Sequence, residues 1–139
     1  MSNKKVLIDT NVCLDAILKR TPFAMDALRV FELSEVNKIN GFVSSHCIDT
    51  LFYILNQTTS KESSYLAIEA LRELVEIAPV NQSIIDASIS AKWTDFEDAI
   101  TYYTALGSGC DTVITRNAKD FKQAKIDICT PEEFLEKYN

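Results

Sequence analysis

Carboxylate and amide side chains follow two short apolar runs of the chain. Asp9 comes directly after Val6-Leu7-Ile8, and Asn117 and Asp120 come shortly after Thr112-Val113-Ile114-Thr115. The chain has one histidine and four cysteines without a C-x-x-C pair, so oxygen ligands and Mg²⁺ or Mn²⁺ are favoured over zinc. A carboxylate-held pair of such ions suits phosphodiester chemistry, because one ion lowers the pKa of an attacking water and the other stabilises the leaving oxygen.

Two more carboxylates fall at the starts of expected helices. Asp49 lies about one turn into the helix after residues 41–44, and Asp98 lies in the first turn of a helix that Thr94-Asp95-Phe96-Glu97 opens as a capping box. Asp49 also borders an apolar helical face, where a carboxylate is partly desolvated and needs a partner. Asp and Asn favour helix caps and turns, so each position alone has a purely structural explanation.

The elements that must position these residues alternate along the chain. Strands are expected at residues 5–8, 41–44, 75–78 and 112–115, with a weaker one at 126–129, because continuous apolar and β-branched runs are typical of a parallel sheet buried on both faces. Segments with a period near 3.6 lie between them, and their apolar faces are Ala24-Ala27-Leu28-Phe31, Ile48-Leu51-Phe52-Leu55 and Ala67-Ala70-Leu71-Leu74. Thr21-Pro22 and Thr130-Pro131 are helix-start patterns with proline at the first helical position.

This alternation predicts an α/β fold of three layers, α/β/α, with a central, mostly parallel sheet of four or five strands in a single domain over residues 1–139. Ligands of such sheets bind beyond the carboxyl ends of the strands. The acidic residues from separate parts of the chain should therefore meet at one edge. Two unit charges 4 Å apart repel by roughly 4 kcal/mol at an effective dielectric of 20, so such a group is tolerable only if some members are protonated or a cation is bound.

Composition limits the other possibilities. The net charge of −6 disfavours a basic nucleic-acid-binding face. No apolar run approaches the ~20 residues of a membrane span or the 7–15 residues of a secretory signal, so we expect no membrane association. We therefore expect a cytoplasmic protein with reduced thiols.

Three blocks of the sequence together resemble the PIN domain family. They are Val6-Leu7-Ile8-Asp9-Thr10-Asn11-Val12, Asp95-Phe96-Glu97-Asp98-Ala99 and Val113-Ile114-Thr115-Arg116-Asn117-Ala118-Lys119-Asp120-Phe121, with Thr130-Pro131-Glu132-Glu133-Phe134 closing the chain. The resemblance implies a divalent-metal-dependent nuclease that acts on RNA. Many small bacterial members are VapC-like toxins that an antitoxin protein inhibits and that form homodimers.

The resemblance also assigns residue roles. Asp9, Asp49 and Asp98 match the first three acidic positions, and Asn117 or Asp120 would supply the fourth. The small polar positions that orient ligands or water are matched by Thr10, Asn11 and Thr115. Two departures stand out: Asp49 is one methylene shorter than the family's usual Glu, and Asn117 is neutral where Asp is common.

The remaining polar residues have competing interpretations. Arg116 is the best candidate for a phosphate contact, since its planar guanidinium suits phosphate. His46 is interpreted as a first-turn helix residue rather than a catalytic base, and Trp93 as a core or dimer residue. A catalytically degenerate PIN-like module that only binds nucleic acid or protein is the main alternative, favoured by Asp49 and Asn117. Receiver and dehalogenase-like phosphatase patterns fit poorly, because only Asp9 follows the first strand and Asn11 stands two residues later.

Overall fold

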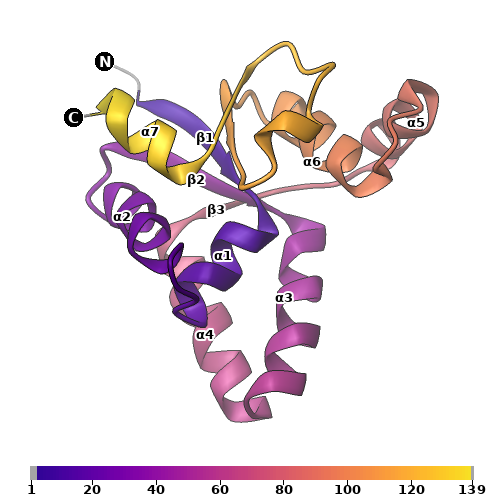
Figure 1. Ribbon diagram of the computed structural model, residues 1–139. Coiled ribbons are helices and arrows are strands. Elements are labelled where there is room, and N and C mark those ends of the chain that lie inside the picture. The colour runs from indigo at the N-terminus through magenta and orange to yellow at the C-terminus, as the bar shows by residue number, and fades with distance from the viewer. Residues whose placement is uncertain (1–2, 139) are drawn as a thin grey trace.

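The computed structural model describes residues 3–138, so residues 1, 2 and 139 of the predicted domain lie outside it. Five strands form one sheet, and helices cover both of its faces (Figure 1). The strands are β1 (Lys4–Ile8), β2 (Ile39–Ser44), β3 (Glu76–Ala78), β4 (Thr112–Ile114) and β5 (Asp127–Cys129). The helices are α1 (Thr10–Ile17), α2 (Ala24–Glu35), α3 (Ser45–Thr58), α4 (Lys61–Leu74), α5 (Gln82–Ala91), α6 (Phe96–Gly107), the short 3₁₀ helix η1 (Ala118–Asp120) and α7 (Pro131–Tyr138).

All strand pairs are parallel, in the order β3-β2-β1-β4-β5, which confirms the predicted fold class and all five predicted strands. The register places Leu7 beside Phe42 and Ile8 beside Ile114. The residues at the carboxyl ends of the three central strands therefore lie at the same level of the sheet. They are Ser44 at the end of β2, Asp9 after β1 and Thr115 after β4.

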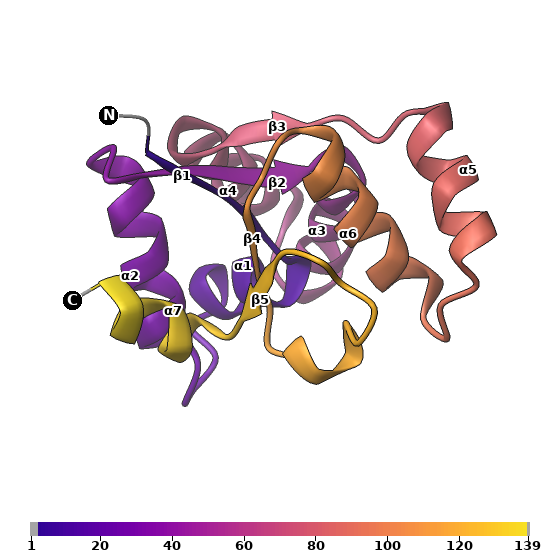
Figure 2. The same cartoon turned by 90° about the horizontal axis from the view of Figure 1, so that it is seen from above.

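Two apolar cores lie on opposite faces of the sheet. Val6 and Ile8 belong to the core that α1, α2, α3, α4 and α7 cover, whereas Leu7 belongs to the core under α6. Alternation of successive side chains along a strand explains this division. Helix α5 packs on α6, farther from the sheet (Figure 2). Trp93 stacks on Tyr102 in the α6 core, with ring centroids 5.2 Å apart, which confirms its interpretation as a core residue.

Two of the three predicted helix starts need correction. The predicted start at Thr130-Pro131 is confirmed, and it forms a capping box: the Glu133 carboxylate accepts from the Thr130 N–H and the Thr130 hydroxyl accepts from the Glu133 N–H. The cap of α6 is Asp95 and not Thr94, because a carboxylate suits the positive helix N-terminus better than a hydroxyl. Helix α2 begins at Ala24 and not at Pro22, because the Arg20 carbonyl accepts from the N–H of Phe23 and of Ala24 and forms a turn first.

The predicted buried faces of α2 and α4 differ slightly from the observed ones. Leu28 of α2 and Ala70 of α4 are exposed, and Val30 and Ser64 are buried instead. Helices α1 and α5 were not predicted. Within residues 3–138, no helix is long and apolar enough to cross a membrane. All four cysteines are free and buried.

Gly41 allows α2 and β2 to approach closely. A Cβ at this position would lie 2.6 Å from Ser34 Oγ and 3.3 Å from Val75 Cγ1. We expect Gly41→Ala to lower the free energy of unfolding by about 1–3 kcal/mol through overpacking, measured by urea denaturation. Gly107→Ala is the control, because its Cβ would meet only the end of the Ile84 side chain. An equal effect of the two substitutions would contradict the prediction.

Candidate active site

Asp9 connects β1 to α1 and is almost completely buried. One carboxylate oxygen accepts from the Thr10 N–H at 2.8 Å and thereby caps α1. The other accepts from the Thr115 hydroxyl at 2.8 Å, across the β1–β4 pair. Asp9 is therefore both a helix cap and a side chain held at the carboxyl edge of the sheet. The structural and the functional interpretations of this residue are compatible.

Asp98 lies in the first turn of α6, and its side chain is also buried. Burial raises the pKa of Asp98 to about 7, and the negative charges around it act in the same direction, namely those of Asp95, Asp9, Asp120 and Glu97. Burial likewise raises the pKa of Asp9, while its hydrogen bonds to Thr115 and Thr10 act in the opposite direction. We call Asp9, Asp95, Asp98 and Asp120 the acidic cluster.

The loop after β4 contributes through Thr115 and η1. Thr115 is fully buried, and its hydroxyl oxygen accepts from the Asn117 N–H at 3.1 Å while donating to Asp9. Asp120 is exposed at the end of η1, and its charge acts on Asp98. Of the two candidates for the fourth acidic position, Asp120 is therefore the one whose charge acts on Asp98. Thr10 is buried beside Asp9, and the backbone carbonyl of Asn11 accepts from Arg20 Nη2 at 3.4 Å.

Asp49 does not join the acidic cluster. Its side chain is exposed on α3, so the expectation that it is desolvated is wrong. The charges that shift Asp9 and Asp98 come from other residues. The apolar face beside Asp49 faces the core through Leu51 and Leu55, and this rotation turns the carboxylate toward solvent. Its role as a ligand stays a prediction.

Arg116 forms contacts that the sequence did not indicate. Its Nε lies 2.9 Å from Oδ2 of Asp15, and its guanidinium lies 4.1 Å from the centre of the Phe23 ring. Asp15 is only 1% exposed, and its other oxygen accepts from Arg20 Nε at 2.9 Å. The sequence signal for Asp15 was available: it is the only charged residue of α1 and stands among apolar residues there.

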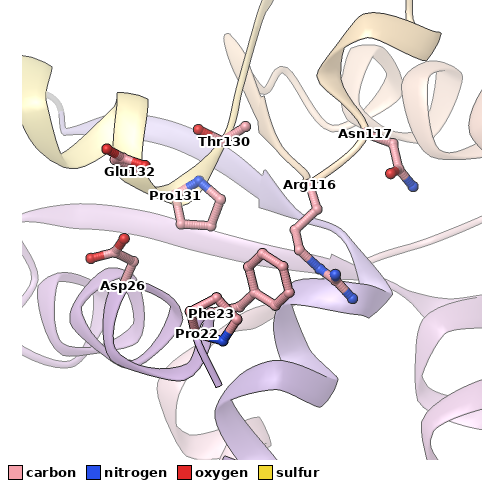
Figure 3. A pocket seen from close by; sticks show the side chains of 8 residues that line it. All are labelled: Pro22, Phe23, Asp26, Arg116, Asn117, Thr130, Pro131 and Glu132. Carbon is pink, nitrogen blue, oxygen red and sulfur yellow. The ribbon is translucent and has the colours of Figure 1, made fainter. Parts of the chain in front are cut away.

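A pocket opens beside this ion pair. Figure 3 shows Arg116 and Asn117 on the loop after β4 at one side of the pocket, and Phe23 lying against the guanidinium. The other residues that line it are Pro22, Asp26, Thr130, Pro131 and Glu132. Because one side of Arg116 is paired with Asp15 and one face is covered by Phe23, the side chain is held in a fixed orientation. A phosphate contact by Arg116 stays a prediction.

The donor set suits a hard divalent cation, since carboxylate oxygens gather where their mutual repulsion opposes ionisation. Among the side chains of residues 3–138, no three His, Cys, Asp or Glu already lie close enough together to hold an ion. Closure of the site around a cation would therefore require side-chain rotations in the acidic cluster. The charge of a cation would favour this by offsetting the repulsion that raises the pKa of Asp98.

The sequence match defines the class of protein. A profile of the PIN domain family matches residues 5–119. The chain therefore belongs to the PIN domain family. Over 144 aligned residues, which span 100% of this chain and 99% of the relative, it is 27% identical to ribonuclease VapC1 of Aquifex aeolicus strain VF5. It is thus a distant homologue of VapC ribonucleases.

Solved structures share the fold at low sequence identity. VapBC-1 from nontypeable Haemophilus influenzae matches with a TM-score of 0.70 and 21% identity, over 92% of this chain and 98% of that one. A toxin–antitoxin complex from Klebsiella pneumoniae matches with a TM-score of 0.69 and 22% identity, over 91% and 97%. VapC20 of Mycobacterium tuberculosis, described as a sarcin–ricin loop cleaving toxin, matches with a TM-score of 0.61 and 14% identity, over 78% and 86%.

The raised pKa of Asp98 predicts how stability varies with pH. Its pKa is about 7 in the folded state and about 3.9 in the unfolded state, so the folded state binds the proton more tightly. In the absence of metal, the free energy of unfolding should fall by a few kcal/mol as pH rises from about 4 to 7 and then level off. Asp98→Asn should weaken this fall and be more stable than the wild type at pH 8. The free energy of unfolding is measured by urea denaturation in the presence of chelator. If its dependence on pH is the same for the wild type and for Asp98→Asn, the prediction is wrong.

The buried ion pairs of Asp15 predict a second stability effect. Asp15→Ala leaves two guanidinium groups without their carboxylate, and we expect a loss of about 3–5 kcal/mol in the free energy of unfolding. Arg20→Gln is the control, because the Arg20 side chain is 38% exposed and the Asp15–Arg116 pair stays in place. We expect that control to lose about 1 kcal/mol or less. Chemical denaturation at pH 7 compares the two, and similar losses would refute the central role of Asp15.

Proposed function

We propose that this protein is a divalent-metal-dependent endoribonuclease that hydrolyses RNA phosphodiester bonds at the acidic cluster. The observation that supports this most is the burial of Asp9 and Asp98, from distant parts of the chain, at the carboxyl edge of the sheet beside further carboxylates. Burial of mutually repelling carboxylates costs stability, and a cation removes that cost. The homology to ribonuclease VapC1 supports the choice of RNA as the substrate.

The positions of the residues suggest a separate role for each. Asp9 and Asp98 would hold Mg²⁺ or Mn²⁺, with Asp120 and Asn117 completing the site from the loop after β4. Thr115 orients Asp9 through its hydroxyl, and Thr10 does so through its backbone N–H. When bound, such ions supply activation of the attacking water and stabilisation of the leaving oxygen. Asp49 is left out of this ligand set because, unlike the similarly exposed Asp120, it is not among the charges that raise the pKa of Asp98.

Arg116 is proposed as a substrate residue with a fixed orientation. The Asp15 carboxylate and the Phe23 ring hold its guanidinium next to Asn117, beside the pocket in Figure 3. A preoriented guanidinium loses less entropy when it binds a phosphate. The net charge of −6 argues against tight binding of RNA over a wide surface, so recognition would be concentrated near this residue.

We also propose that the protein is the toxin of a toxin–antitoxin pair and forms a homodimer in the cytoplasm. Structures of toxin–antitoxin complexes share its fold. Helix α2 exposes Met25 and Leu28, and Val36 is exposed just beyond its end, so this side offers apolar surface to a protein partner. Four buried free cysteines are compatible with a reducing compartment.

The proposal is tested by incubating the purified protein with RNA and Mg²⁺ or Mn²⁺. We expect cleavage that chelator stops and that Asp98→Asn lowers by more than about 100-fold, since loss of even an outer partner of a metal ligand costs about 10–100-fold. Asp86→Asn is the matched control, because it removes one exposed carboxylate from α5. Gel analysis of fluorescently end-labelled RNA measures the rate.

Two outcomes would count against the nuclease. Cleavage that persists in Asp98→Asn would come from a contaminant or from another site. RNA binding without cleavage by the wild type would favour the catalytically degenerate binding module, which the neutral Asn117 and the exposed Asp49 suggest. A further comparison with Asp49→Asn decides whether this residue belongs to the site, and we expect its rate to stay within a few-fold of the wild type.

A further inference from the structure

His46 is the single histidine of the chain and lies in the first turn of α3, at the same edge of the sheet as Asp9. Its ring is held by a 2.8 Å hydrogen bond between Nδ1 and the hydroxyl of Ser44. Ser44 also caps α3, because its hydroxyl oxygen accepts from the Cys47 N–H at 3.2 Å. Burial of Ser44 and these two hydrogen bonds fix the orientation of the imidazole.

The other ring nitrogen has no partner. Nε2 of His46 is buried and makes no hydrogen bond within the described part of the chain. An unsatisfied buried polar atom costs about 1–3 kcal/mol, so such an atom in a native protein calls for a specific explanation. An ion or ligand that binds the nitrogen is one of these explanations.

The register of the sheet brings His46 toward the acidic cluster. Leu7 pairs with Phe42, so Asp9 is level with Ser44 on the neighbouring strand, and adjacent strands are about 4.8 Å apart. His46 is linked to Ser44 by the hydrogen bond above, and it lies near enough to Asp9 that its protonated form would lower the pKa of that carboxyl. The imidazole and the Asp9 carboxylate therefore share one electrostatic environment.

The hydrogen bond to Ser44 can be made in the tautomer that metal binding requires, with the proton on Nδ1. The Ser44 hydroxyl oxygen has two lone pairs, which can accept from the Cys47 N–H and from a protonated Nδ1. Nε2 then keeps a free lone pair. Histidines that bind metals typically donate their second ring N–H in this way, which fixes the tautomer and the ring.

We propose that Nε2 of His46 is a nitrogen ligand of the divalent cation held by Asp9 and Asp98, and that it makes the site prefer Mn²⁺ over Mg²⁺. The proposal rests on the metal-dependent function proposed above and adds a ligand from α3, the helix on which Asp49 is exposed. Imidazole suits transition metals, whereas Mg²⁺ takes oxygen ligands. His46 is thus more than the first-turn helix residue that the sequence indicated.

The test uses Mn²⁺ as its own spectroscopic probe. Pulsed electron paramagnetic resonance of Mn²⁺ bound to the wild-type protein should show the modulation of a directly coordinated ¹⁴N nucleus. Incorporation of ¹⁵N-histidine should convert this signal to that of ¹⁵N without any mutation. Because the chain has one histidine, an isotope effect identifies His46.

A variant gives a second measurement. His46→Gln should lose the nitrogen signal and weaken Mn²⁺ binding by about 10–100-fold, with a smaller change for Mg²⁺, in titrations of free Mn²⁺. Asp86→Asn is the control and should bind both ions as the wild type does. The ¹⁵N experiment keeps the proposal testable if His46→Gln does not fold.

The outcomes separate this inference from the proposed function. Bound Mn²⁺ without an isotope-sensitive nitrogen signal overturns the role of His46 and leaves a metal-dependent nuclease of carboxylate ligands intact. A loss of affinity in His46→Gln without that signal also overturns it, because the imidazole then acts outside the coordination sphere. Failure of the wild type to bind Mn²⁺ or Mg²⁺ at millimolar concentration overturns both.

Discussion

The hydrogen bond between Thr115 and Asp9 joins the two strands on which the site depends. Parallel pairing of β1 with β4 puts the first residue after each strand at the same level. The Thr115 hydroxyl can then donate to a carboxylate 106 residues away along the chain. The same oxygen accepts from Asn117, so one buried hydroxyl positions both Asp9 and the loop that carries Asp120. The register of the parallel sheet thus determines which side chains meet at its carboxyl edge.

The acidic cluster lowers the stability of the metal-free protein but offers carboxylate ligands to a cation. Burial, together with the charges of neighbouring carboxylates, raises the pKa values of Asp9 and Asp98, so the metal-free fold is less stable with both ionised than it would be with neutral side chains. A domain of ordinary stability, about 5–15 kcal/mol, tolerates such a cost when other interactions are sufficient. The two apolar cores on the faces of the sheet supply that stability. Retention of the carboxylates is understandable if a cation uses them.

A second group of charges consists of Asp15 and the two arginines that form ion pairs with it. Asp15, under 2% exposed, lies between Arg20 and Arg116 and links α1 to the loop after β4. This link and the Phe23 ring hold Arg116 next to Asn117. Because the guanidinium is fixed by protein contacts, its orientation does not depend on substrate. Stability and substrate placement are therefore coupled through one buried carboxylate.

The sequence alone determined the fold class, the five strands and the helix start at Thr130-Pro131, because these depend on local hydrophobic pattern and on residues three positions apart. It also predicted that Asp9, which follows a strand, and Asp98, which lies in the first turn of a helix, are near each other, and the charge of Asp9 does act on Asp98. The sequence did not predict the orientation of α3 about its axis. Packing of Leu51 and Leu55 in the core turns Asp49 to solvent. The sequence also did not indicate that Arg116 pairs with Asp15, or that Nε2 of His46 is buried without a hydrogen-bond partner among residues 3–138. Such contacts join residues distant in sequence, and only the tertiary structure decides which side chains meet.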